Sequence, residues 1–160
     1  MTPHPLMPAK FKPAVTVSAA AWRKAVPSLA TLARRAAAAA HAAAQADGAA
    51  ALAGETAILF ARDADIQPLN AQYRGKDKPT NVLSFPGIEG GGDVILALET
   101  VVKEAEIQRK TVPDHTAHLI AHGILHLMGY DHAQGRAEAR RMERLERLVL
   151  SGLGIADPYV

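Results

Sequence analysis

The sequence predicts an α/β fold, a small mixed β-sheet with packed helices. Short segments rich in apolar and β-branched residues alternate along the chain with longer segments of helical periodicity. A glycine-rich stretch separates two of the short segments, which predicts one hairpin among otherwise helix-connected strands. No internal repeat interrupts this alternation.

The length and composition favour one domain. The chain has 160 residues, of which 49% are hydrophobic, so it can bury a sizeable core. Prolines space the first dozen residues, which disfavours a regular element there. We therefore predict an extended or disordered tail over residues 1–12 and a single domain over residues 13–160.

Composition also excludes several classes of site and partner. The chain has no cysteine, so any metal must be held by imidazole, carboxylate or backbone oxygen. A net charge of +2 permits contact with a polyanion, but a dedicated duplex binder is usually more basic, so we do not expect DNA as a partner. No apolar stretch reaches the roughly 18 uncharged residues of a membrane span, and no apolar signal-peptide core follows the N-terminus. We expect a cytoplasmic protein without membrane contact.

The N-terminal third predicts an edge strand followed by an interrupted helix. Residues 13–17 form a short segment with β-branched residues. From residue 22 to about residue 46 the apolar residues fall on one helical stripe, and Pro27 marks an early break or kink. Gly48 ends this helix, and residues 49–54 form a loop.

The next two elements are a strand and a short helix. Residues 56–60 are apolar and bounded by polar residues, which predicts a buried strand. Residues 63–73 have helical periodicity, with Ile66, Leu69 and Tyr73 on the predicted inner face.

The predicted hairpin follows, and then another helix. Strands over residues 80–85 and 93–98 flank the glycine-rich turn. A helix over residues 99–110 is expected to turn Val102, Ala105 and Ile107 inward.

Two helices complete the domain. Proline and aspartate suit the first turn of a helix over residues 113–128, and Gly129 stops it at a position where a left-handed cap is common. Residues 136–150 predict a final amphipathic helix whose arginines and glutamates alternate outside an apolar stripe.

Three histidines near the end of the helix over residues 113–128 predict a metal site. His122 and His126 are four residues apart, so they share one helix face. Gly129 allows a sharp turn that can bring His132 to a third position. Three imidazoles without a fourth protein ligand leave an open coordination position, which is typical of a catalytic zinc that activates water. The spacing therefore predicts a small metal-dependent hydrolase with one zinc ion per chain.

Neighbouring residues refine this hypothesis. The spacing matches the long zinc motif of metzincin proteases, but Gly123 occupies the position of their catalytic glutamate, which argues against a peptidase. His118 lies four residues before His122 on the same face. It is a ligand if His132 is not; we favour a supporting or substrate-facing role. Asp131 either caps the turn or orients a ligand imidazole.

A basic loop precedes the strand over residues 80–85. Arg74, Lys76 and Lys78 lie close together in it. Such a loop is most often a solvated surface, but beside a metal site arginine can bind phosphate with two hydrogen bonds and lysine can add charge. Tyr73 either packs on its helix or stacks on an exposed RNA base.

Together these motifs resemble the bacterial YbeY family of rRNA maturation factors. The resemblance lies in YRGKDKPTNVLSFP (73–86), GDVI (92–95), HGILHLMGYDH (122–132) and LGIADPY (153–159). It extends over about residues 55–159, whereas the N-terminal third matches only in outline.

The resemblance implies a metal-dependent endoribonuclease specific for single-stranded RNA. Its implied roles are 16S rRNA 3′-end maturation and ribosome quality control, with the small ribosomal subunit and its proteins as partners. It assigns zinc to His122, His126 and His132, and a functionally important arginine to Arg74. Two alternatives stay open: a non-catalytic ribosome-associated RNA-binding factor with a structural zinc, and a zinc hydrolase of another substrate.

Overall fold

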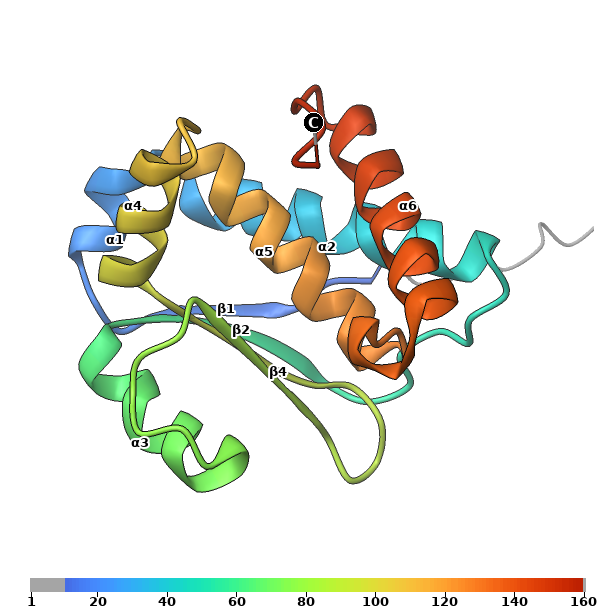
Figure 1. The fold of residues 1–160 in the computed structure, drawn as a ribbon, viewed down its shortest axis with the longest axis horizontal. Helices are drawn as coiled ribbons and strands as arrows, with labels where there is room; N and C mark the ends of the chain where they lie inside the picture. Colours follow the sequence, from blue (N-terminus) through green and yellow to red (C-terminus); the bar gives the residue numbers. More distant parts are fainter. Residues whose placement is uncertain (1–10, 160) are drawn as a thin grey trace, which may run out of the picture.

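The computed structural model describes residues 11–159 and confirms the predicted α/β class (Figure 1). Its four strands are β1 (Ala14–Val17), β2 (Thr56–Ala61), β3 (Val82–Pro86) and β4 (Gly92–Ala97). Its helices are α1 (Ala21–Ala25), α2 (Leu29–Ala46), α3 (Asp63–Arg74), α4 (Leu98–Ile107), α5 (Val112–Leu127), the short 3₁₀ helix η1 (His132–Gln134) and α6 (Arg136–Gly152). Most of the predicted N-terminal tail, residues 1–10, lies outside the described residues.

The strands form one mixed sheet in the order β1-β2-β4-β3. β1, β2 and β4 run parallel, and β3 pairs with β4 in the opposite direction as the predicted hairpin. β1 lies at one edge, as predicted for this short strand. At its end, the backbone amide of Ser18 donates to the carbonyl of Phe60 at 3.0 Å.

Helices cover the two faces of the sheet unequally (Figure 1). Alternate residues of a strand point to opposite faces. Ile58 and Val94 pack under the layer formed by α1, α2, α4, α5 and α6, whereas Ile95 packs against Ile66 of α3 on the other side. The larger core therefore lies on the face that carries α5.

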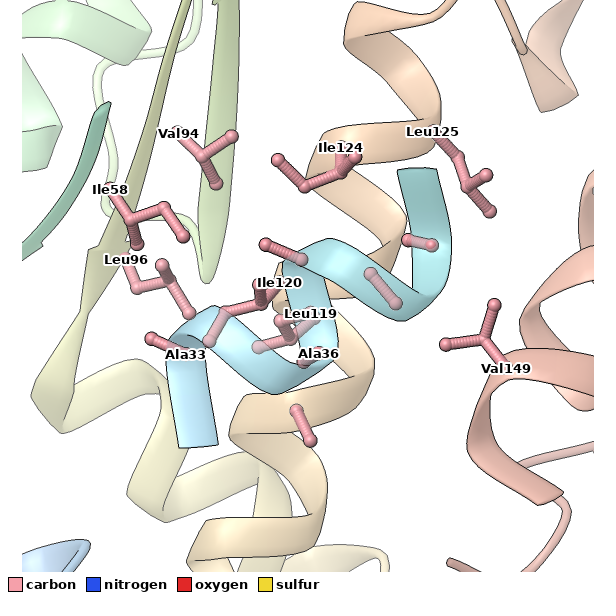
Figure 2. Packing of buried hydrophobic residues seen from close by; sticks show 14 of the residues in the cluster. Ala33, Ala36, Ile58, Val94, Leu96, Leu119, Ile120, Ile124, Leu125 and Val149 are labelled. Atoms are coloured by element: carbon pink, nitrogen blue, oxygen red, sulfur yellow. The ribbon is translucent and has the colours of Figure 1, made fainter. Parts of the chain in front are cut away.

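The alanine-rich helix α2 packs closely against α5. Several of its alanines are fully buried: Ala33, Ala36, Ala37, Ala40 and Ala44. In Figure 2, Ala33 and Ala36 lie beside Leu119 and Ile120 of α5, next to the strand residues Ile58 and Leu96. Small side chains on one helix let bulkier residues of the other fill the space between them.

Some predicted details were right and others wrong. The break at Pro27 separates α1 from α2, where Ser28 takes a left-handed conformation (φ 58°). Tyr73 is wrong as an inner-face residue, since it is 62% exposed. Val102 and Ile107 are also exposed, because α4 turns Val101 toward the core together with Ala105, which was predicted correctly. No helix within residues 11–159 is long and apolar enough to cross a membrane.

Gly123 permits the close approach of α5 to the sheet. A Cβ atom there would lie 2.6 Å from Cγ1 of Val94 and 3.1 Å from Oγ of Ser84. Ser84 also donates a hydrogen bond from its hydroxyl to the carbonyl of Gly123 at 3.1 Å. The residue at the protease glutamate position is therefore glycine because β3 and β4 leave no room for a side chain.

We expect Gly123→Ala to lower the free energy of unfolding by about 1–3 kcal/mol, because the added methyl group overpacks against Val94. Chemical denaturation measures this change. Gly152→Ala is the matched control: no atom lies within 4 Å of its Cβ position near the end of α6, so this variant should be neutral or more stable by up to about 1 kcal/mol. Equal effects of the two variants would contradict the close-packing argument.

Candidate metal centre and its cleft

Helix α5 supplies two of the three histidines. Its start is capped by Thr111, whose hydroxyl accepts from the amide of Asp114 at 3.2 Å, with a proline in the first turn. On the last two turns, His122 and His126 lie on one face with their ring centroids 4.5 Å apart. Their Nε2 atoms approach to 2.9 Å, so both imidazoles direct the same type of nitrogen to one point.

The turn after α5 brings the third histidine to the same point. Gly129 adopts φ 98°, a left-handed conformation that favours glycine, and the chain reverses there. Asp131 then accepts from the amide of Ala133 at 2.8 Å and caps η1. As a result, the His132 ring lies 5.3 Å from that of His122 and 5.5 Å from that of His126, measured between centroids.

A buried tyrosine anchors this turn to the end of α2. Tyr130 is 5% exposed, and its hydroxyl donates to Asp47 at 2.7 Å. Arg141 of α6 donates to the same carboxylate at 2.8 Å. The hydrogen bond from Tyr130, followed by the effects of Arg141 and Arg144, holds the pKa of Asp47 below its usual value despite partial desolvation. These contacts hold the backbone on either side of His132.

The three histidines fit a metal ion. One nitrogen from each of His122, His126 and His132 lies within 4.8 Å of the others. Burial, followed by the neighbouring His122 and His132, lowers the pKa of His126 to about 4. His126 is therefore uncharged at neutral pH with a lone pair available, as metal ligation requires. Within residues 11–159 no further histidine or carboxylate belongs to this group.

Glu146 of α6 is a site residue that the sequence prediction missed. It is fully buried, and its Oε1 lies 2.5 Å from Nδ1 of His122. Burial alone would raise the pKa of this carboxyl group, but the neighbouring imidazoles of His118 and His122 lower it overall. Its position between Leu145 and Val149 on the apolar stripe of α6 was the signal that could have revealed it.

His118 lies beside Glu146 and not among the three clustered histidines. Its Nε2 is 3.5 Å from Oε1 of Glu146, and its side chain is 13% exposed. Another imidazole of α5, His115, is buried and pairs at 2.9 Å with Glu104 of α4; it does not belong to the cluster. The face of α5 that carries His122 thus has three carboxylate–imidazole contacts, of which one involves a clustered histidine.

The three histidines open into a cleft of about 560 Å³. One wall comes from β3 and the residues before it, and the other from α5 and η1. The lining residues are Arg74, Asn81, Val82, Leu83, Ser84, Pro86, His122, His126, Asp131, His132 and Ala133. Arg74 reaches this cleft from the last turn of α3, which Gly75 ends in a left-handed conformation (φ 70°).

The other predicted substrate residues lie near this cleft without lining it. Lys76 and Lys78 are exposed in the loop after α3. The side-chain amide of the buried Asn70 donates to the carbonyl of Lys78 at 2.8 Å and orders this loop. Tyr73 packs its ring edge on Phe85, with 4.8 Å between centroids, and leaves most of its surface exposed.

The chain is similar in sequence to known proteins. Residues 17–154 match the family model described as Endoribonuclease YbeY. A protein of that name from Rhizobium etli is 51% identical over 114 residues, which cover 66% of this chain and 66% of that relative's length. One from Paramagnetospirillum magneticum is 46% identical over 159 residues, 91% of this chain and 94% of the relative.

The fold is also similar to a solved structure. The solution structure of a protein from Thermotoga maritima superposes with a TM-score of 0.53, covering 88% of this chain and 91% of the other at 21% sequence identity. At that identity the likeness concerns the fold alone.

We expect zinc to stabilise the protein through the three histidines. At a free zinc concentration about 100 times the Kd, the free energy of unfolding should rise by about 2.7 kcal/mol. His126→Ala should lose this increment, because it removes one of the three clustered ligands. Thermal unfolding with and without zinc measures the effect.

His115→Ala is the control, since it removes a buried imidazole outside the cluster. It is expected to lower the stability of the metal-free protein and to keep the zinc-dependent increment. Retention of the full increment by His126→Ala would show that the ion binds elsewhere.

Proposed function

The chain belongs to the YbeY family of endoribonucleases, and from this premise we propose that it is a zinc-dependent endoribonuclease specific for single-stranded RNA. Its proposed roles are 16S rRNA 3′-end maturation and ribosome quality control, in the cytoplasm and with the small ribosomal subunit and its proteins as partners. The proposed domain covers residues 13–160 and contains the whole site.

One observation supports this function above the others: Arg74 and the three histidines line the same cleft. A guanidinium group offers two parallel donors that match a phosphate, and its charge persists at any physiological pH. Arg74 would therefore hold the scissile phosphate and offset the negative charge that develops on it.

The histidine cluster has a separate task. His122, His126 and His132 would hold the ion, which when bound would supply Lewis-acid chemistry toward a phosphoryl oxygen and toward water. The neutral state of His126 keeps its nitrogen free for this role. Water or the RNA 2′-hydroxyl can be the nucleophile, and the two leave different product ends.

The residues around the cleft suit a single strand. An unstacked base can lie on an aromatic ring, and Tyr73 offers an exposed ring next to Arg74. Lys76 and Lys78 would attract neighbouring phosphates as point charges. Paired RNA holds its bases in the helix, so it cannot present a splayed nucleotide to this cleft without unpairing.

The two other functions considered are less well supported. Gly123, packed against Val94, leaves no position for the glutamate that a protease of this motif uses. Membership of a family of endoribonucleases favours catalysis over a purely docking role for the zinc. The cleft is also lined by Arg74, which a purely structural zinc would not need.

We expect Arg74→Ala to lower the rate of cleavage of single-stranded RNA on the order of 100-fold, because the phosphate loses its principal donor. Fluorescent RNA oligonucleotides, single-stranded and paired, measure the rate with the zinc-loaded protein. Arg34→Ala is the matched control, since Arg34 is an exposed arginine of α2 beside β1 and does not line the cleft. Normal cleavage by a folded, zinc-loaded Arg74→Ala variant would refute the role of Arg74.

A further inference from the structure

The last described residues of the chain reach the metal centre. We propose that Glu146 and Tyr159 are positioning residues that orient His122, so that the C-terminal segment over residues 153–159 helps to set the affinity for the metal. The inference rests on the proposed metal binding by the histidine cluster. It assigns a role to a sequence motif that the cleft itself leaves unexplained.

The first link joins Glu146 to His122. Oε1 of Glu146 lies 2.5 Å from Nδ1 of His122, while Nε2 of the same ring points to Nε2 of His126 at 2.9 Å. A carboxylate oxygen accepts, so Nδ1 of His122 donates and its Nε2 keeps the free lone pair. The carboxylate thereby fixes both the tautomer and the rotation of the ring that a metal ligand needs.

Burying the carboxylate of Glu146 costs free energy, so its position needs an explanation. Its side chain lies on the apolar face of α6 with Met142, Leu145 and Val149, and it is fully buried. A buried carboxylate loses its hydration and must be compensated by several hydrogen bonds. An apolar residue at this place would serve the core at least as well, so the contact to His122 is the better explanation for a glutamate.

The second link joins Tyr159 to the other oxygen of Glu146. The hydroxyl of Tyr159 donates to Oε2, so each oxygen of the carboxylate has its own partner. The segment after α6 turns back beside that helix to reach this position (Figure 1). The ring of Tyr159 also meets the edge of His118, with 5.9 Å between centroids.

Two contacts hold the C-terminal segment in this place. Nε of Arg147 lies 3.1 Å from Asp157, whose carboxylate also accepts from the amide of Tyr159 at 2.8 Å. The guanidinium carbon of Arg147 lies 5.3 Å from the centroid of the Tyr159 ring. The sequence Asp-Pro-Tyr at residues 157–159 therefore supplies the anchor and the donor together.

Helix α5 carries a second histidine that pairs with a carboxylate but lies outside the histidine cluster. Glu104 of α4 lies 2.9 Å from Nε2 of His115, which is buried about two turns before His122 on α5. This pair has the same chemistry, but His115 does not belong to the histidine cluster. Comparison of the two carboxylates separates an effect on the metal from an effect on folding.

The test compares Glu146→Gln and Tyr159→Phe with Glu104→Gln in the full chain. The zinc Kd is measured by competition with a chromophoric chelator, and the free energy of unfolding is measured on metal-free protein. We expect the Kd to rise by about 10- to 100-fold in Glu146→Gln. Tyr159→Phe should raise it by a smaller factor, whereas Glu104→Gln should leave it unchanged.

If Glu146→Gln and Tyr159→Phe both bind zinc with the same Kd as the wild-type protein, the inference is overturned, whatever the stability of the variants. If Glu146→Gln does not fold, Tyr159→Phe decides, because it removes only a hydroxyl from a residue that is 41% exposed. Cobalt(II) in place of zinc gives a second reading: its visible absorption should change in Tyr159→Phe and stay constant in Glu104→Gln. Failure of wild-type protein to bind zinc would instead refute the proposed function together with this inference.

Discussion

The site depends on the packing of helix α5 against the sheet. At Gly123 the helix backbone approaches Val94 so closely that no side chain fits between them. This approach fixes the rotation of α5 about its axis. Ile120 and Ile124 then face the core, while His122 and His126 converge on the cleft side. One close contact thus determines where two of the three clustered histidines point.

The remaining parts of the site come from segments that are far apart in the sequence. The turn at Gly129, held by the bond from Tyr130 to Asp47, brings His132 back to the end of α5. Arg74 arrives at the opposite wall because α3 ends beside the start of β3. Arg74 and the three histidines therefore line the same cleft although they come from distant parts of the sequence.

The sequence was sufficient for most of the elements and for the grouping of His122, His126 and His132, because periodicity, breakers and spacing are local properties. The sequence was not sufficient to predict which side chains are buried. Glu146 was expected outside, since a charged residue in an amphipathic helix is usually solvated; only the packing of α6 on α5 reveals its contact with His122. Likewise, Tyr73 fitted a helical stripe in the sequence, but α3 packs only a small cluster around Ile66 on its face of the sheet, and the ring of Tyr73 stays exposed.

The central claim is that His122, His126 and His132 bind one zinc ion in the cleft that contains Arg74. X-ray absorption spectroscopy at the zinc edge, on protein loaded with one equivalent, tests it most directly. We expect three imidazole ligands per zinc in the wild-type protein and two in a His132→Ala variant. A ligand set unchanged by that substitution, or one dominated by carboxylates, would contradict the account.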